Sequence, residues 1–521
     1  MTKSAGSSRP PEADATAAAP PDDDIAALAK GGRTNFFGFV IRLLARIPFI
    51  FIAGHAYGPE LLGRFASAVI AVELAAQFAT IGLKRGLAQQ LSTTDRPHNH
   101  VVADGLLCAF IASAAASALL MVFPQAMFPQ GDIRNAEWLL PLVIFGISGA
   151  DVALAALAYK HDVKSTVHVR AIVEPWVISI AAGVFVFTTF QQDGLILAYV
   201  LSVVAGLAAA LWRLFRSYGI ARGWRPHPGA MIALARRNFP LAAADAIEWV
   251  SRRLDIFLLG LLVAPQFVGI YYAAQQVASM PQKLKTSFDP ILAPVVTQKL
   301  ADGDKKAVAK QVRQVGFWII AAQAGIALAL GIPGEALMGL FGEGGSFVGG
   351  TAALAFLLAA EVVAATAAVS EAALVYVARH RNLMLSCLTI AVQAALTLGL
   401  ISAMRALGWP EAWQAAGAAL SLAMALGLGS ILKSRLLSKL LGAPVQGWRW
   451  SLLLAGGAAS IVGFAATLIP EWLELSVGAP AILITFGLVI WYRGFTDEDR
   501  KLFRFGKKEK AELPASEPAT P

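Results

Sequence analysis

Apolar segments of about 20 residues recur along this chain from residue 35 to residue 492. Wound as an α-helix, a segment of that length crosses the roughly 30 Å hydrocarbon core of a bilayer. The chain is 57% hydrophobic and only 15% charged, which lies outside the usual composition of soluble domains. The sequence therefore predicts an all-α polytopic membrane protein.

The apolar segments divide into fourteen predicted transmembrane helices. We expect the first twelve to form two lobes of six helices each, with two further helices after them. The predicted spans lie near 35–57, 62–82, 101–123, 137–159, 168–190, 194–215, 239–263, 266–297, 310–332, 350–377, 383–404, 412–432, 450–469 and 473–492.

The basic residues are distributed unevenly between the predicted loops. If the N-terminus lies in the cytoplasm, Lys and Arg gather in the inward segments, and the outward loops hold only Arg134 and Arg405. This is the positive-inside pattern, and it predicts two cytoplasmic termini. The Lys and Arg residues that set the membrane topology then account for the net charge of +9, so we expect no nucleic-acid partner.

Composition also marks the domain boundaries. The two ends of the chain are rich in Ala, Pro and charged residues, which predicts disordered cytoplasmic tails. A basic inward segment between the sixth and seventh spans reads as a linker between halves. The predicted units are a tail over 1–33, an N-lobe over 34–215, the linker over 216–238, a C-lobe over 239–432, the last two helices over 433–495 and a tail over 496–521.

Charged residues lie in the middle of the seventh span. Asp245, Glu248, Arg252 and Asp255 are spaced i, i+3, i+7 and i+10, which places them on one side of a helix. A charge at the bilayer centre costs roughly 2.5–3.5 kcal/mol on insertion scales, so such residues usually face a bundle interior or an aqueous cavity. The stripe is typical of a transport pathway, although Glu248 at i−4 and Asp255 at i+3 could also neutralise Arg252 structurally.

A short repeat supports the division into two lobes. Residues 58–65 (GPELLGRF) and residues 264–271 (APQFVGIY) share a pattern of Gly or Ala, then Pro, and later Gly followed by an aromatic residue. Both segments are predicted outward turns after the first span of a lobe. Applying the same offset backwards places Arg46 opposite Arg252, each near the middle of its span. Repeats that both start inside are parallel repeats.

These segments also carry a family resemblance. Tyr57 to Phe65, together with Arg253 to Gly260 and Val268 to Tyr271, resemble the signatures of Wzx-like polysaccharide flippases of the multidrug/oligosaccharidyl-lipid/polysaccharide exporter superfamily. The resemblance implies two six-helix lobes around a central cavity and a polyprenyl-diphosphate-linked oligosaccharide as substrate. It also implies a bacterial inner-membrane protein that is not an enzyme. The chain departs from the family turn at Tyr57 and Ala264.

Basic residues in three spans are candidates for binding the diphosphate of such a substrate. Arginine presents a fixed fork of donors that can hold a phosphate through two hydrogen bonds. We expect Arg46 and Arg252 to bind the diphosphate, with Arg42 and Arg253 in support and Lys283 near the cytoplasmic mouth. Ion pairing within each lobe, or anchoring at the membrane surface for Arg42 and Lys283, is the alternative.

Acidic residues within the spans are candidates for coupling transport to H+ or Na+. A carboxylate in a cavity can carry a cation if its surroundings raise its pKa. We select Asp255, Glu361 and Glu248; helix–helix hydrogen bonding is the alternative. No further cofactor is expected, and no Cys/His cluster predicts a metal site.

Two other functions fit the composition less well. A cation-coupled multidrug exporter of the same superfamily would need acids rather than arginines on the first helix. A membrane glycan polymerase or ligase would need a sizeable outward loop with catalytic Arg or His, and the outward loops are short. As partners we expect the lipid-linked glycan and membrane lipid, with a glycan polymerase and a chain-length regulator as further candidates, around a monomeric protein.

Overall fold

The computed structural model describes residues 47–129, 131, 133–286, 303–496, 499 and 500. Within these residues the regular structure is entirely helical, and a helix coincides with each of the fourteen predicted spans. Ten helices of the described part are long and apolar enough to cross a membrane. The predicted all-α membrane fold is therefore confirmed.

The N-lobe begins with helical residues from Ile47 that include a π-helical turn, η1. Gly58 has a positive φ of 77° at the start of α2, and a turn over 80–82 separates α2 from α3. Most of the later helices are joined by short turns. The elements of this lobe are η1 (Ala53–Tyr57), α2 (Gly58–Ala79), α3 (Leu83–Thr93), α4 (His98–Val122), η2 (Pro124–Ala126), η3 (Asn135–Leu142), α5 (Val143–Tyr159), α6 (Val163–Val167), η4 (His168–Val173), α7 (Glu174–Phe185), η5 (Gln191–Asp193) and α8 (Gly194–Tyr218).

The C-lobe and the last two spans follow the same all-helical pattern. Their elements are α9 (Pro228–Leu262), α10 (Pro265–Thr286), α12 (Lys305–Gly331), α13 (Gly334–Gly339), η6 (Glu343–Gly345), η7 (Val348–Gly350), α14 (Thr351–Val377), α15 (Arg379–Ala406), α16 (Glu411–Leu441), α17 (Trp450–Ala466), α18 (Glu471–Leu473), η8 (Glu474–Gly478), α19 (Ala479–Val489) and η9 (Ile490–Gly494).

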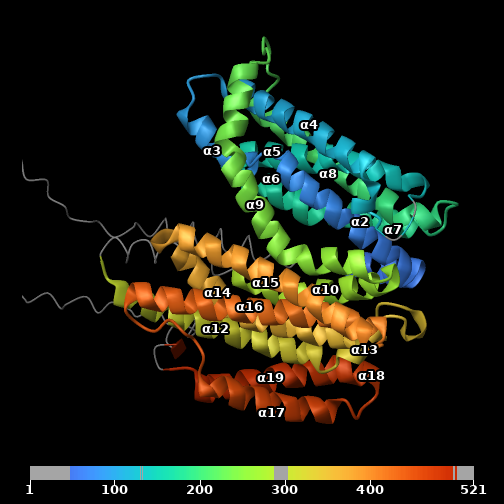
Figure 1. Ribbon diagram of the computed structural model, residues 1–521, viewed down its shortest axis with the longest axis vertical. Coiled ribbons are helices and arrows are strands. Elements are labelled where there is room, and N and C mark those ends of the chain that lie inside the picture. The colour runs from blue at the N-terminus through green and yellow to red at the C-terminus, as the bar shows by residue number, and fades with distance from the viewer. Residues whose placement is uncertain (1–46, 130, 132, 287–302, 497–498, 501–521) are drawn as a thin grey trace, which may run out of the picture.

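The two lobes meet at one end of the molecule and diverge toward the other (Figure 1). Where they meet, α2 of the N-lobe packs along α10 of the C-lobe. We call this the turn end, because both repeat turns lie there; α3 and the start of α9 lie at the opposite end. One apolar core runs through both lobes near the turn end and includes Phe65, Leu62, Tyr271 and Phe347.

Helix α9 begins at Pro228, inside the segment predicted to be a linker. Proline is favoured at the first position of a helix because its missing N–H has no partner there. Met231, Leu234 and Asn238 are buried at i, i+3 and i+7, so one face of the new helical turns is covered. Met231 and Leu234 join the apolar core of the N-lobe. Burial of this face explains why the helix extends beyond its membrane-length part.

The last two spans pack on the C-lobe, on the side away from the N-lobe (Figure 1). Leu452 of α17 and Phe486 of α19 share an apolar core with Phe317 of α12. Just beyond them, Asp499 is fully buried and accepts hydrogen bonds from Gln314, Trp318, Arg449 and Thr496. These contacts fasten the end of the described chain to α12.

Candidate functional site

The two repeat turns pack against each other at the turn end. A Cβ atom on Gly63 would lie 1.7 Å from the carbonyl oxygen of Pro265, and one on Gly269 would lie 1.9 Å from that of Pro59. Gly63 and Gly269 occupy the same position in the two copies of the repeat. The contact is therefore reciprocal, and backbone meets backbone with no room for a side chain.

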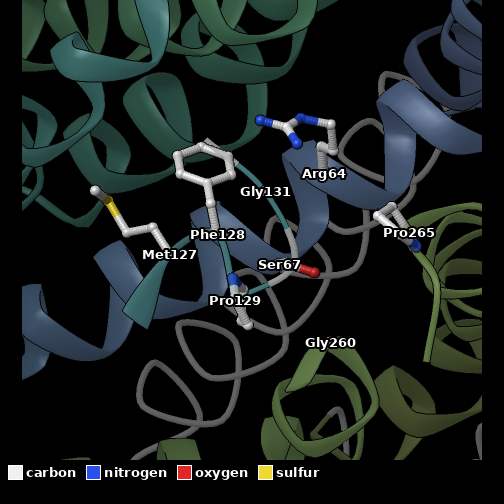
Figure 2. A pocket seen from close by; sticks show the side chains of 8 residues that line it. All are labelled: Arg64, Ser67, Met127, Phe128, Pro129, Gly131, Gly260 and Pro265. Carbon is white, nitrogen blue, oxygen red and sulfur yellow. The ribbon is translucent and has the colours of Figure 1, made fainter. Parts of the chain in front are cut away.

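A small pocket adjoins this contact (Figure 2). Arg64 and Ser67 of α2 line it together with Gly260 and Pro265, and its volume is about 20 Å³. A space of that size holds one water molecule and no substrate. The Arg64 guanidinium bonds both carboxylate oxygens of Glu137 at 2.9 Å, and both side chains are buried. This pair ties η3 to α2 beside the lobe contact.

At the opposite end, acidic side chains of α9 form ion pairs with α3 of the N-lobe. Arg85 of α3 contacts Asp245 at 2.7 Å and Glu248 at 2.7 Å. Glu248 also accepts a hydrogen bond from Arg252 at 3.1 Å, which is the i−4 pairing that the sequence permits. The Arg252 side chain stays 44% exposed. Three of the four stripe residues therefore belong to one ion-pair network that joins α9 to α3.

Asp255, the fourth residue of the stripe, has a separate environment within the C-lobe. Its Oδ2 accepts hydrogen bonds from the Tyr271 hydroxyl at 2.6 Å and from Gln275 at 3.0 Å. Its Oδ1 is buried and has no hydrogen-bond partner among the described residues. Arg253 donates a hydrogen bond to Gln275 at 3.0 Å, so this cation is linked to Asp255 only through the Gln275 side chain. This fully buried carboxylate is consequently held mainly by neutral donors.

A cavity of about 670 Å³ lies on the N-lobe side of the molecule. Side chains of α2, α3, α5, α6, η4, α7 and α8 line it, and Tyr272 of α10 adds a wall from the C-lobe. Within it, Arg170 donates hydrogen bonds to Asp151 and, at 2.6 Å, to Glu174. Glu73 and Lys84 also line the cavity.

None of the site residues selected from the sequence is among the described residues that line this cavity. Asp151, Glu174 and Glu73 are acids within predicted spans, and Arg170 joins two of them. The i, i+4 spacing of Arg170 and Glu174 could have revealed half of the cluster. Asp151 lies on another helix, so its part in the cluster depends on tertiary packing.

The remaining predicted site residues are scattered or lie outside the described part. Arg42 and Arg46 lie outside the described residues. Lys283 lies on α10, and the structure does not describe its side chain. Glu361 is half-buried on α14. The structure thus brings Glu248 and Arg252 together on α9 and places Arg253 and Asp255 beside the same residue, Gln275.

Comparison with solved structures identifies the fold. An inward closed conformation of the lipid II flippase MurJ superposes with a TM-score of 0.64 at 12% identity, covering 90% of this chain and 98% of that one. An inward-facing multidrug resistance MATE family transporter of the MOP superfamily gives 0.63 at 14% identity, covering 77% and 94%. An outward-facing MATE transporter of that superfamily gives 0.51 at 14% identity, covering 80% and 96%.

Comparison with sequences identifies the family. A search of curated proteins gives no match. A family model described as "Polysaccharide biosynthesis protein" matches residues 34–298, which is just over half of the chain. The match begins at the predicted start of the N-lobe and extends beyond both repeat turns. This chain, a multi-pass helical protein with the fold of the MOP superfamily, therefore belongs to the polysaccharide biosynthesis protein family.

Proposed function

We propose that the protein is a flippase that moves a polyprenyl-diphosphate-linked oligosaccharide across the bacterial inner membrane by alternating access. The observation that carries the proposal is the pair of lobes that meet at the turn end, beside a cavity of about 670 Å³ to which both lobes contribute. Parallel-repeat transporters work by rocking such lobes around a site near the middle of the membrane. The polysaccharide family match supports the substrate class.

In this proposal the turn end faces the outside and both termini are cytoplasmic. The described chain is then closed outside and opens toward the cytoplasm. The higher TM-score against the inward-facing MATE transporter, 0.63 against 0.51 for the outward-facing one, supports that state. The protein would be a transporter rather than an enzyme, and the glycan polymerase that uses its product is a candidate partner.

Basic residues are proposed to hold the diphosphate. Arg46 and Arg252 would bind it, with Arg42, Arg253 and Lys283 in support. The exposure of Arg252 supports this role, since almost half of its side chain can still reach a ligand while it contacts Glu248. A guanidinium fork and a phosphate match in charge and geometry.

Carboxylates on α9 and α14 are proposed to carry the coupling H+ or Na+. Asp255 suits this role because one of its buried oxygens lacks a hydrogen-bond partner among the described residues. A cation moving inward yields about 2.3 kcal/mol per charge per 100 mV. Glu361 and Glu248 are the further candidates.

The experiment is to replace Arg46 and Arg252 together by Ala and to measure surface glycan and lipid-linked glycan in the same cells. We expect surface glycan to fall to background while lipid-linked glycan accumulates and the protein stays in the membrane. Arg225→Ala, an exposed arginine of the loop before α9, is the matched control. Full export by the double variant would refute the proposal.

A cation-coupled multidrug exporter is the second candidate. Among the described residues, the charged side chains that line the cavity are Glu73, Asp151 and Glu174 against Arg170 and Lys84, and their net charge of −1 favours cationic ligands. Deleting the gene separates the two functions. Loss of surface glycan with unchanged dye and drug sensitivity supports the flippase, and the reverse supports the exporter.

A further inference from the structure

The cavity on the N-lobe side has two polar side chains in its lining without a hydrogen-bond partner among the described residues. Glu73 and Gln77 lie one turn apart on α2 and both line the cavity. Neither side chain makes a hydrogen bond or an ion pair with any residue that the structure describes. Both are half-buried. A carboxylate and an amide that line a cavity without such partners are available to bind a polar ligand.

On the facing wall of the cavity, the charged side chains already form hydrogen bonds with each other. Arg170 donates to both Asp151 and Glu174, and the Ser202 hydroxyl donates to the Glu174 backbone carbonyl at 2.8 Å. These contacts fix the charged groups on η4, α5 and α7 to each other. The wall thus provides shape and a negative field rather than free donors.

Aromatic rings complete the lining. Phe65 packs edge-on against Tyr199, with ring centroids 5.7 Å apart, and against Phe49 at 5.8 Å. Tyr272 faces them from the C-lobe. Flat apolar faces beside hydroxyl and carboxylate acceptors match a sugar ring, which has C–H faces and a hydroxyl edge. Because Tyr272 belongs to the other lobe, separating the lobes would dismantle this lining.

Charge and size decide which part of a lipid-linked glycan would enter. The described residues of the lining carry a net charge of −1, which opposes a diphosphate and favours neutral or amino-bearing sugars. The volume of about 670 Å³ lies within the roughly 300–1,000 Å³ of typical small-molecule sites.

We propose, on the basis of the function proposed above, that this cavity binds the sugar residues of the head group and that the diphosphate stays outside it. Glu73 and Gln77 receive the sugar hydroxyls, and Phe65 and Tyr199 form the apolar floor. Recognition of the glycan is then separate from recognition of the lipid diphosphate.

The test uses the full-length protein in nanodiscs and three probes. They are polyprenyl diphosphate without sugar, the lipid-linked glycan extracted from the producing cells, and the free oligosaccharide released from it. Glu73→Leu should weaken binding of the lipid-linked glycan about tenfold, which corresponds to one hydrogen bond to a charged group. Binding of the free oligosaccharide should fall in parallel, and binding of polyprenyl diphosphate should stay within about twofold.

Three further variants keep the test decisive. Gln77→Leu should give the same pattern if Glu73→Leu does not fold, and Glu60→Leu, at an exposed site on the same helix, is the matched control. Glu73→Gln should retain most of the glycan affinity, because an amide still binds hydroxyls.

Other results would overturn the sugar site or the flippase function. Equal losses for both lipids, or an unchanged glycan affinity in Glu73→Leu and in Gln77→Leu, would overturn the sugar site alone. A wild-type protein that binds neither lipid would overturn the proposed flippase function with it.

Discussion

The half of α9 near the turn end and the half near the opposite end are held by different forces. Toward the turn end, Asp255 is fully buried and bonded to neutral side chains of α10, and Gly260 packs on Ser67 of α2. Toward the opposite end, Asp245 and Glu248 are bonded to Arg85, whose side chain is 53% exposed. Packing and neutral hydrogen bonds fix one half, and ion pairs with an exposed arginine fix the other.

This difference shows how a single helix can serve two lobes. Buried, close-packed contacts are either fully formed or lost, because protein interiors tolerate almost no gap or overlap between atoms. Exposed ion pairs are weak and are screened by salt. We therefore expect the turn end to behave as a rigid joint and the contact with Arg85 to be adjustable. Perturbing each contact in turn tests that contrast.

The largest effect is expected at the glycine contact. Replacing Gly63 or Gly269 by Leu places a side chain where a backbone oxygen lies less than 2 Å from the new Cβ. The lobes must then separate at the turn end, at or above the roughly 1–3 kcal/mol typical of overpacking. We expect loss of glycan export and a lower melting temperature of the purified protein.

Gly399→Leu is the control for this pair, because nothing lies within 4 Å of a Cβ at Gly399 of α15. It should export normally and melt like the wild type. If Gly63→Leu and Gly269→Leu matched this control, the turn end would not be a rigid joint.

A smaller effect is expected at Asp255. Tyr271→Phe removes the 2.6 Å hydrogen bond to the buried carboxylate and leaves Gln275 as its neutral donor. A hydrogen bond to a charged group contributes about 1.5–3 kcal/mol, so we expect a loss of that order in the free energy of unfolding. Denaturant unfolding in detergent measures it, with Tyr492→Phe, an exposed tyrosine, as the control.

A double-mutant cycle with Asp255→Asn isolates the interaction. The effect of Tyr271→Phe should shrink when the carboxylate is already an amide. Equal effects in both backgrounds would show that the hydroxyl stabilises something other than Asp255.

The smallest effect is expected at Glu248. Glu248→Gln removes the ion pairs with Arg85 and Arg252, and both partners of each pair are about half exposed, so solvent screening limits each pair to about 0.2–1 kcal/mol. We expect a small loss of stability at low salt that disappears at high salt. Melting curves at several salt concentrations measure it; a large, salt-independent loss would mean that the opposite end is as rigid as the turn end.

Much of the fold followed from local sequence signals. Apolar length located the spans, and the turns at 58–65 and 264–271 identified the repeat, because both signals are local. The early start of α9 was missed because basic residues in 216–238 read as a loop. The buried face of Met231, Leu234 and Asn238 is visible only when the i, i+3, i+7 pattern is sought there.

The candidate site was less accessible to sequence reasoning. The contact of Arg252 with Glu248 followed from their i−4 spacing, because both lie on one helix. Arg85 is 163 residues away from Glu248, and Arg170 reaches Asp151 on another helix. Such partners depend on how helices pack, which spacing along the chain does not encode.

The burial of Met231 and Leu234 of α9 in the N-lobe core has a consequence for biosynthesis. The first six spans emerge from the ribosome before this part of α9, so part of the N-lobe core stays open at its α3 end until α9 follows them. The second repeat must supply the missing apolar surface. The nascent N-lobe would therefore be most exposed to quality-control proteases in the interval before α9 packs against it.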